Sequence, residues 1–109
     1  MIDWARVADL RSEVGEEDFG EVVDLFLEEV EEVAERLSTA PETARLEEDL
    51  HFLKGSALSL GFSQFSSLCQ KGESLSASGK QAEVDLAEIL TAYQQSKQRF
   101  LTELPTAFS

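Results

Sequence analysis

The sequence is poor in cysteine, proline and positive charge, and it contains no long run of apolar residues. Its 109 residues include a single cysteine, Cys69, which cannot form a disulfide within the chain. This lone thiol and the absence of a basic, apolar leader segment indicate a reducing, cytoplasmic setting. No apolar stretch approaches the roughly 20 residues that a membrane-spanning helix needs, so we expect no contact with a membrane.

Positive charge is scarce because 9 Lys and Arg stand against 22 Asp and Glu, which gives a net charge of −13. Binding to nucleic acid or to an anionic membrane needs clustered Lys and Arg, so this balance argues against both as partners. Residues 12–35 contain eleven acids and no Lys or Arg. We interpret this segment as a solvated helix face, with a docking patch for a basic protein as the alternative. The charge also favours a monomer.

Five segments carry apolar residues at helical spacing, and no segment alternates as a β-strand does. The expected helices run from about Trp4 to Val14, Glu16 to Leu37, Glu42 to Leu60, Ser63 to Ala77 and Ala82 to Leu104. Pro41 suits the first turn of the third helix, and Pro105 is expected to end the fifth. Short connections between long amphipathic helices favour antiparallel neighbours. We therefore predict an all-α single domain over residues 1–109, an antiparallel four-helix bundle with a short N-terminal capping helix.

The only histidine, His51, lies in the third expected helix and points away from its apolar stripe. That stripe consists of Leu46, Leu50, Leu53, Ala57 and Leu60. His51 sits roughly 140° from the first of these residues around the helix. Lys54, Gly55 and Leu58 follow at spacings that place them on the face of His51. Gly55 costs the helix about 0.5–1 kcal/mol relative to Ala, so we interpret it as clearance for a partner that approaches beside the ring.

Few kinds of chemistry suit an exposed histidine with clearance beside it. A hydrolytic triad needs a nucleophile and an acid in a pocket, and no G-x-S-x-G element is present. A metal site needs several ligands, although Glu47 and Glu48 leave a weak site open. The segment 53–56 lacks the other glycines of a phosphate-binding loop. The remaining interpretation is a histidine used in trans, whose ring nitrogen attacks phosphorus while a nearby cation offsets the phosphoryl charge.

The segment His51-Phe52-Leu53-Lys54-Gly55-Ser56-Ala57, followed by Leu60-Gly61, resembles the signature of histidine-containing phosphotransfer (HPt) domains. Leu68-Cys69 and Glu73 are similar to the following helix of that family. Gly15-Glu16-Glu17-Asp18-Phe19 and Leu25-Phe26-Leu27 are similar to the opening of its bacterial members. The resemblance covers nearly the whole chain.

This resemblance implies a phosphorelay carrier, not an enzyme with turnover of its own. His51 would accept a phosphoryl group at Nε2 from a receiver-domain phospho-aspartate and pass it to another receiver aspartate. The implied partners are receiver domains of response regulators and hybrid histidine kinases. Lys54 would offset phosphate charge, Gly55 would let the receiver approach, and Leu58 would contribute to an apolar docking surface. Glu73 would bond the other ring nitrogen, and no cofactor or metal is implied because Mg²⁺ would belong to the receiver.

Two other classes of protein display a histidine on a helical bundle or carry a strongly acidic helix. A sensor-kinase dimerisation domain usually has an acid directly after the histidine and a proline five residues on, where this chain has Phe52 and Ser56. An acidic helical adaptor would bind a basic partner without phosphotransfer and leave His51 idle. Within the family, a domain without its relay would only sequester partners, and the intact His51 argues against this.

Overall fold

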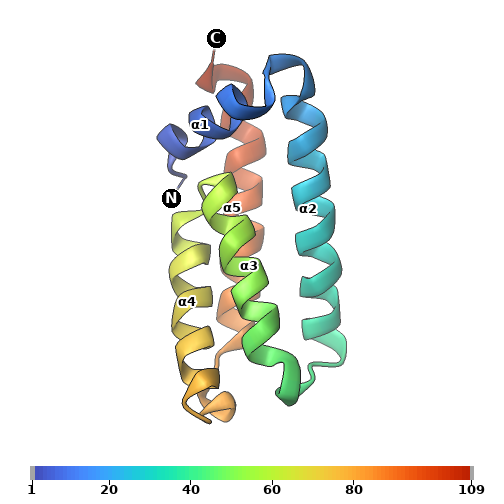
Figure 1. Cartoon of the computed structure of the whole chain (residues 1–109), viewed down its shortest axis with the longest axis vertical. Helices are drawn as coiled ribbons and strands as arrows, with labels where there is room; N and C mark the ends of the chain where they lie inside the picture. The colour runs from blue at the N-terminus through green and yellow to red at the C-terminus, as the bar shows by residue number, and fades with distance from the viewer. Residues whose placement is uncertain (1, 109) are drawn as a thin grey trace.

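The computed structural model of the chain is built almost entirely of α-helices and describes residues 2–108 (Figure 1). Met1 and Ser109, the ends of the expected domain, lie outside the described residues. The helices are α1 (Trp4–Val14), α2 (Glu16–Thr39), α3 (Leu46–Leu60), α4 (Ser63–Ala77) and α5 (Leu86–Ala107), with 3₁₀ turns η1 (Thr43–Arg45) and η2 (Gln81–Glu83). Over residues 2–108 there is no β-strand, and Ile2 and Phe62 form an isolated bridge. The predicted all-α class is confirmed.

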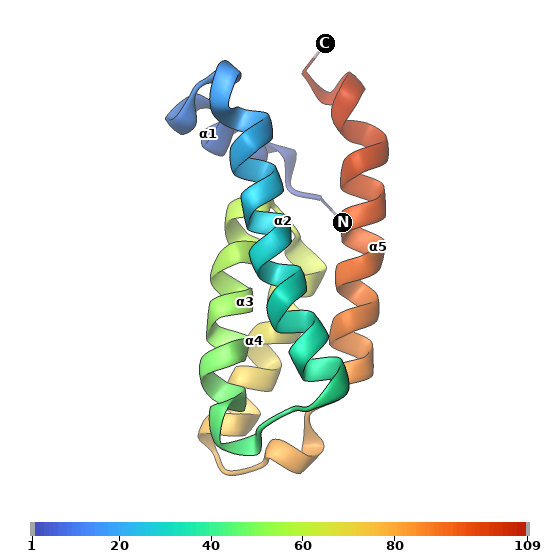
Figure 2. The same ribbon diagram turned by 90° about the vertical axis from the view of Figure 1, so that its right-hand side faces the viewer.

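The four long helices α2 to α5 form an antiparallel bundle, and the fold as a whole, α1 included, measures 45 × 21 × 21 Å (Figures 1 and 2). α3 and α4 lie side by side on one side of the bundle, and α2 and α5 complete it. α1 crosses the end of the bundle where α2 begins and α5 ends, which confirms the predicted capping helix (Figure 1). No helix within the described residues combines the length and apolar content that crossing a bilayer requires.

The core lies where the apolar stripes of the five helices meet, and aromatic side chains fill its middle. Phe62 lies between Tyr93 and Phe100, with ring centroids at 6.2 and 5.5 Å. Trp4 of α1 stacks on Phe100 of α5 at 5.5 Å, so the capping helix is tied to the last helix of the chain. The predicted stripe of α3 is buried throughout: Leu46, Leu50, Leu53, Ala57 and Leu60.

Three polar contacts hold α2 against its neighbours. Arg36 forms an ion pair with Asp49 of α3, whose side chain is 6% exposed. Toward α5, the Tyr93 hydroxyl donates to Glu31 Oε2 at 2.8 Å, and Lys97 pairs with the same carboxylate. The hydrogen bond from Lys97 is the largest of the causes that lower the pKa of Glu31. These contacts fix α2 on both sides.

The segment between α2 and α3 differs from its prediction. α2 continues to Thr39, and α3 begins at Leu46 instead of Glu42 because the 3₁₀ turn η1 intervenes. Pro41 lies in the connection and not in the first turn of α3. A proline disfavours helical backbone in the residue before it, and Ala40 has φ −150° and ψ 65°. Helical structure therefore resumes only beyond the proline.

Both predicted ends of the last helix are wrong. The 3₁₀ turn η2 occupies the segment around Ala82, and α5 begins at Leu86 because Asp85 caps it by accepting from the Glu88 N–H at 3.0 Å. At the other end, Pro105 does not stop α5, which runs on to Ala107. Only Thr106 and Ala107 follow Pro105 in α5, so the distortion that the proline causes affects little of the helix beyond it.

Candidate functional site

His51 projects from the middle of α3, and its orientation follows from the residues around it. The neighbouring Leu50 and Leu53 are fully buried and fix the rotation of the helix. One step along the helix from Leu50 turns the side chain by about 100°, toward solvent. The His51 side chain is 69% exposed, which confirms the predicted outward orientation.

Gly55 and Leu58 extend this exposed face along α3 in the direction of α1. A Cβ atom built on Gly55 would meet nothing within 4 Å, so no packing within the chain requires a glycine at this position. Leu58 is 50% exposed, and its carbonyl accepts from Arg6 Nε of α1 at 3.3 Å. The structure thus places Gly55 and Leu58 on open surface, with α1 beside the last turn of α3.

A close approach of α4 to α3 brings the second half of the site to His51. A Cβ atom on Gly72 would lie 2.8 Å from Leu50 Cδ1 and 3.3 Å from Ile89 Cδ1. A larger residue would therefore have to displace packed side chains from the core. The glycine lets the two helices meet closely, and the next residue, Glu73, then reaches the side chain of His51. The sequence analysis did not single out Gly72.

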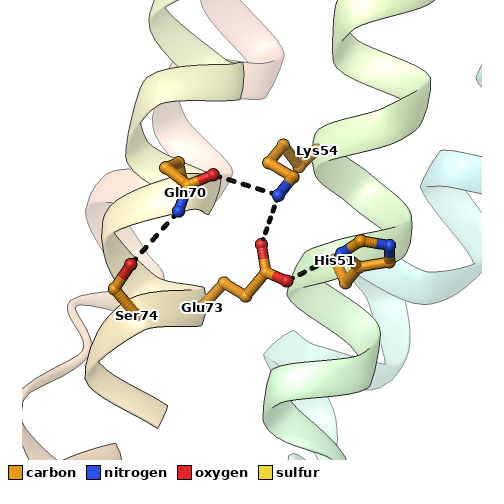
Figure 3. A network of polar contacts seen from close by, with 5 residues as sticks. All are labelled: His51, Lys54, Gln70, Glu73 and Ser74. Carbon is orange, nitrogen blue, oxygen red and sulfur yellow. Dashed lines mark hydrogen bonds and ion pairs between the residues drawn. The ribbon is translucent and has the colours of Figure 1, made fainter. Parts of the chain in front are cut away.

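Glu73 lies at the centre of a polar network that joins α3 to α4 (Figure 3). Its Oε2 lies 2.7 Å from His51 Nδ1, and its Oε1 lies 2.7 Å from Lys54 Nζ. Lys54 Nζ also donates to Gln70 Oε1 at 3.0 Å, and Gln70 Nε2 donates to Ser74 Oγ at 3.1 Å. The structure therefore brings three of the predicted site residues, His51, Lys54 and Glu73, into direct contact.

The network keeps Glu73 ionised. The hydrogen bond from Lys54 is the largest cause that lowers the pKa of this carboxyl, and the bond to His51 acts in the same direction against the effect of burial. The Glu73 side chain is only 16% exposed, so little solvent screens these contacts.

An ionised carboxylate accepts hydrogen bonds and cannot donate them, which fixes the arrangement of protons on the ring. When the ring is neutral, Nδ1 must carry the hydrogen that Glu73 accepts, and Nε2 then holds a free lone pair. In Figure 3 the second ring nitrogen of His51 points away from Glu73. The arrangement supplies an exposed ring nitrogen able to attack an electrophile that approaches from outside.

Gln70 and Ser74 belong to this network and were missed by the sequence analysis. Gln70 lies three residues before Glu73, a spacing that puts both on one face of α4, so helical geometry could have identified it. Cys69 is fully buried, and burial is the main cause that raises its thiol pKa to about 12. The thiol therefore stays protonated and takes no part in the polar network.

The described residues, 2–108, contain no set of side chains suited to bind a metal ion. No group of three or more His, Cys, Asp or Glu side chains in this part of the chain could hold a metal ion. Glu47 and Glu48, which left a weak site open in the sequence, therefore form no such group with His51.

Comparison with known proteins identifies the family. The family model described as "Hpt domain" matches residues 21–106, a range that contains all five predicted site residues. No curated protein and no solved structure matches the chain significantly. Hpt domains are helical bundles that carry phosphoryl groups on histidine in phosphorelays and interact there with receiver domains. Because the match spans most of the sequence and agrees with the fold, this chain belongs to the Hpt domain family.

Proposed function

We propose that this chain is a phosphorelay carrier in which His51 takes a phosphoryl group from one receiver aspartate and gives it to another. The observation that carries the proposal is the 2.7 Å contact between His51 Nδ1 and Glu73 Oε2 on an exposed helix face. This contact holds the hydrogen on Nδ1 and leaves Nε2 as the nucleophile.

The phosphoryl transfer needs no added base, because no proton has to be removed from the attacking nitrogen. The Nε2 lone pair attacks the phosphorus of the receiver's aspartyl phosphate, the bond from phosphorus to the aspartate oxygen breaks, and the aspartate leaves as a carboxylate. The ring, which keeps its hydrogen on Nδ1, gains positive charge, and the adjacent Glu73 carboxylate stabilises it. Attack by a second receiver's aspartate on the phosphohistidine reverses these bond changes and restores the neutral ring.

The other site residues support the docked receiver in this proposal. Lys54, one turn from His51, offsets the charge of the phosphoryl group. Gly55 admits the receiver's backbone beside the ring, and the exposed Leu58 contributes apolar docking surface. The Mg²⁺ that the reaction requires is held by the receiver. The chain acts as a monomer in the cytoplasm, has no turnover of its own, and needs no cofactor.

Incubation with a ³²P-phosphorylated receiver domain and Mg²⁺ tests the proposal. We expect the chain to acquire label that is stable in base and lost in acid, as phosphohistidine is, and we expect His51→Gln to acquire none. Glu73→Gln should retain the label at a reduced rate, because the amide can still hydrogen-bond the ring but carries no charge. Label that persists in His51→Gln, or no label with any of a panel of receivers, would overturn the proposal.

A further inference from the structure

A second surface lies on the outer side of the first half of α2, away from His51. A shallow depression there is lined by the last residue of α1 and by six residues from the first half of α2. Its apolar lining consists of Val14, Val22 and Leu25, and its acidic lining consists of Asp18, Glu21, Asp24 and Glu28. Leu25 is 55% exposed, although it is a large apolar side chain. We call these residues the α2 groove.

The α2 groove and His51 lie on different sides of the bundle. Val23 and Leu27 are buried, so Leu25, midway between them, points about 160–200° away from the core. In Figure 2, which has α2 nearest the viewer, this outer side of α2 faces the reader. His51 instead faces α4, as its contact with Glu73 shows.

The two surfaces are also separated along the bundle. Arg36 of α2 pairs with Asp49 of α3, which places these residues at the same level. From that level, Leu25 lies about 16 Å along α2 and His51 about 3 Å along α3, at 1.5 Å per residue. Figure 1 shows that α2 and α3 are antiparallel, so both displacements run in the same direction along the bundle. The difference between them leaves about 13 Å between Leu25 and His51 along the axis.

The charge of the α2 groove limits what can occupy it. Four carboxylates line the groove, and no Lys or Arg is among the described residues that line it. The nearby Arg11 is engaged by Glu16 and lies over the Phe108 ring at 4.7 Å. Nucleic acid, an anionic bilayer and a second copy of this chain would each bring negative charge against negative charge. The remaining complement is a cationic surface with apolar residues at its centre.

The spacing of the apolar residues in the groove indicates which kind of partner segment would fit it. Val22 and Leu25 are three residues apart on one helix, and Glu21, Asp24 and Glu28 lie along one side of them. A helix with apolar residues at i, i+3 or i+4 and i+7, and Lys or Arg beside them, matches this pattern in both hydrophobicity and charge. We propose that the α2 groove docks an amphipathic, Lys- and Arg-bearing helix of a partner protein. This activity is independent of phosphotransfer and adds a second point of attachment to the chain.

A synthetic peptide tests the proposal on the intact chain. The probe is a fluorescent amphipathic helix of about 18 residues, with Leu at i, i+3, i+4 and i+7 positions and Lys at the flanks. Fluorescence anisotropy measures its Kd at low and at physiological salt. We expect Leu25→Ala and the double variant Glu21→Gln/Asp24→Asn each to raise the Kd at least about threefold. The replaced side chains are exposed, and circular dichroism verifies that the variants remain folded.

The matched control is Glu32→Gln/Glu35→Gln, which changes the net charge equally on the same helix but outside the α2 groove. It should leave the Kd unchanged, and so should His51→Gln, because the histidine lies on another side. The proposal is overturned if the peptide does not bind or if the control weakens binding as much as the groove variants do. Sedimentation that shows a dimer lost in Leu25→Ala would likewise overturn it, since the occupant would then be a second copy.

Discussion

Replacement of Gly55 should separate the stability of the chain from its activity. Gly55 lies inside α3, and a Cβ atom there would meet nothing within 4 Å. Removing a glycine from an unobstructed helix interior should raise the free energy of unfolding by about 0.5–1 kcal/mol in Gly55→Ala. Urea unfolding followed by circular dichroism at the helix band measures this change.

Gly55→Gln should be about as stable as Gly55→Ala but slower than the wild type in phosphotransfer. Its side chain would stand one turn from His51, where a docked receiver must approach. Forcing an extra side chain into a packed contact costs about 1–3 kcal/mol, which corresponds to a transfer rate about five- to 150-fold lower. Single-turnover transfer from a phosphorylated receiver measures the rate.

Gly20 provides the control, because it also lies inside a helix, α2, and a Cβ atom there meets nothing within 4 Å. Gly20→Ala should stabilise the chain as Gly55→Ala does, and Gly20→Gln should transfer at the wild-type rate. Equal rates for Gly55→Gln and Gly20→Gln would refute the idea that Gly55 provides clearance.

Three further predictions concern the packing and the charges that support the site. Gly61 ends α3 with φ +72°, and a Cβ atom there would lie 2.5 Å from the Asp3 carbonyl oxygen. Gly61→Ala should therefore lower the free energy of unfolding by at least about 1–2 kcal/mol. An unchanged midpoint of urea unfolding would contradict this. Arg36→Leu leaves the buried Asp49 carboxylate without its ion-pair partner and should lower the free energy of unfolding by about 1–3 kcal/mol. Adding Asp49→Asn should then recover part of the loss, and additive losses would disprove the coupling. The pKa of Glu73 is lowered in the folded chain. The ionised carboxylate therefore adds to the free energy of unfolding above the ordinary carboxyl pKa, and this contribution is lost as the pH falls through the pKa of Glu73 in the folded chain. The stability difference between wild type and Glu73→Gln should therefore shrink as the pH drops from neutral to below about 4, and a difference independent of pH would contradict the lowered pKa.

Residue spacing alone predicted the features that depend on one helix at a time. The outward direction of His51 follows from its position beside Leu50, since both the apolar stripe and the exposed face are set by helical geometry. The start of α3 and both ends of α5 could not be predicted in the same way, whereas the end of α3 at Leu60 was predicted correctly. The 3₁₀ turns before both helices leave no periodic signal, and a proline near a helix end, such as Pro105, is tolerated because few hydrogen bonds remain there to break.

Residue spacing within one helix could not predict the contacts between helices. Glu73 was identified through the resemblance to HPt domains, because nothing in α4 alone shows that it meets α3. That meeting depends on the close approach at Gly72, whose consequence is visible only when Leu50 is placed against it. Spacing could have placed Gln70 on the face of α4 that carries Glu73, but its contact with Lys54 of α3 is visible only in the structure. The α2 groove was likewise only an acidic segment in the sequence, and the structure shows that Val14 and Leu25 line it beside the acids.

The central claim is that His51 Nε2 carries the phosphoryl group while Nδ1 is held by Glu73. Long-range ¹H–¹⁵N NMR spectra of the chain before and after phosphorylation by a receiver test it directly, and no assignment is needed because His51 is the only histidine. We predict that the neutral ring carries its hydrogen on Nδ1 beforehand, and that phosphorus is bonded to Nε2 afterwards. Phosphorus on Nδ1, or a phosphorylated chain whose histidine is unmodified, would contradict the account.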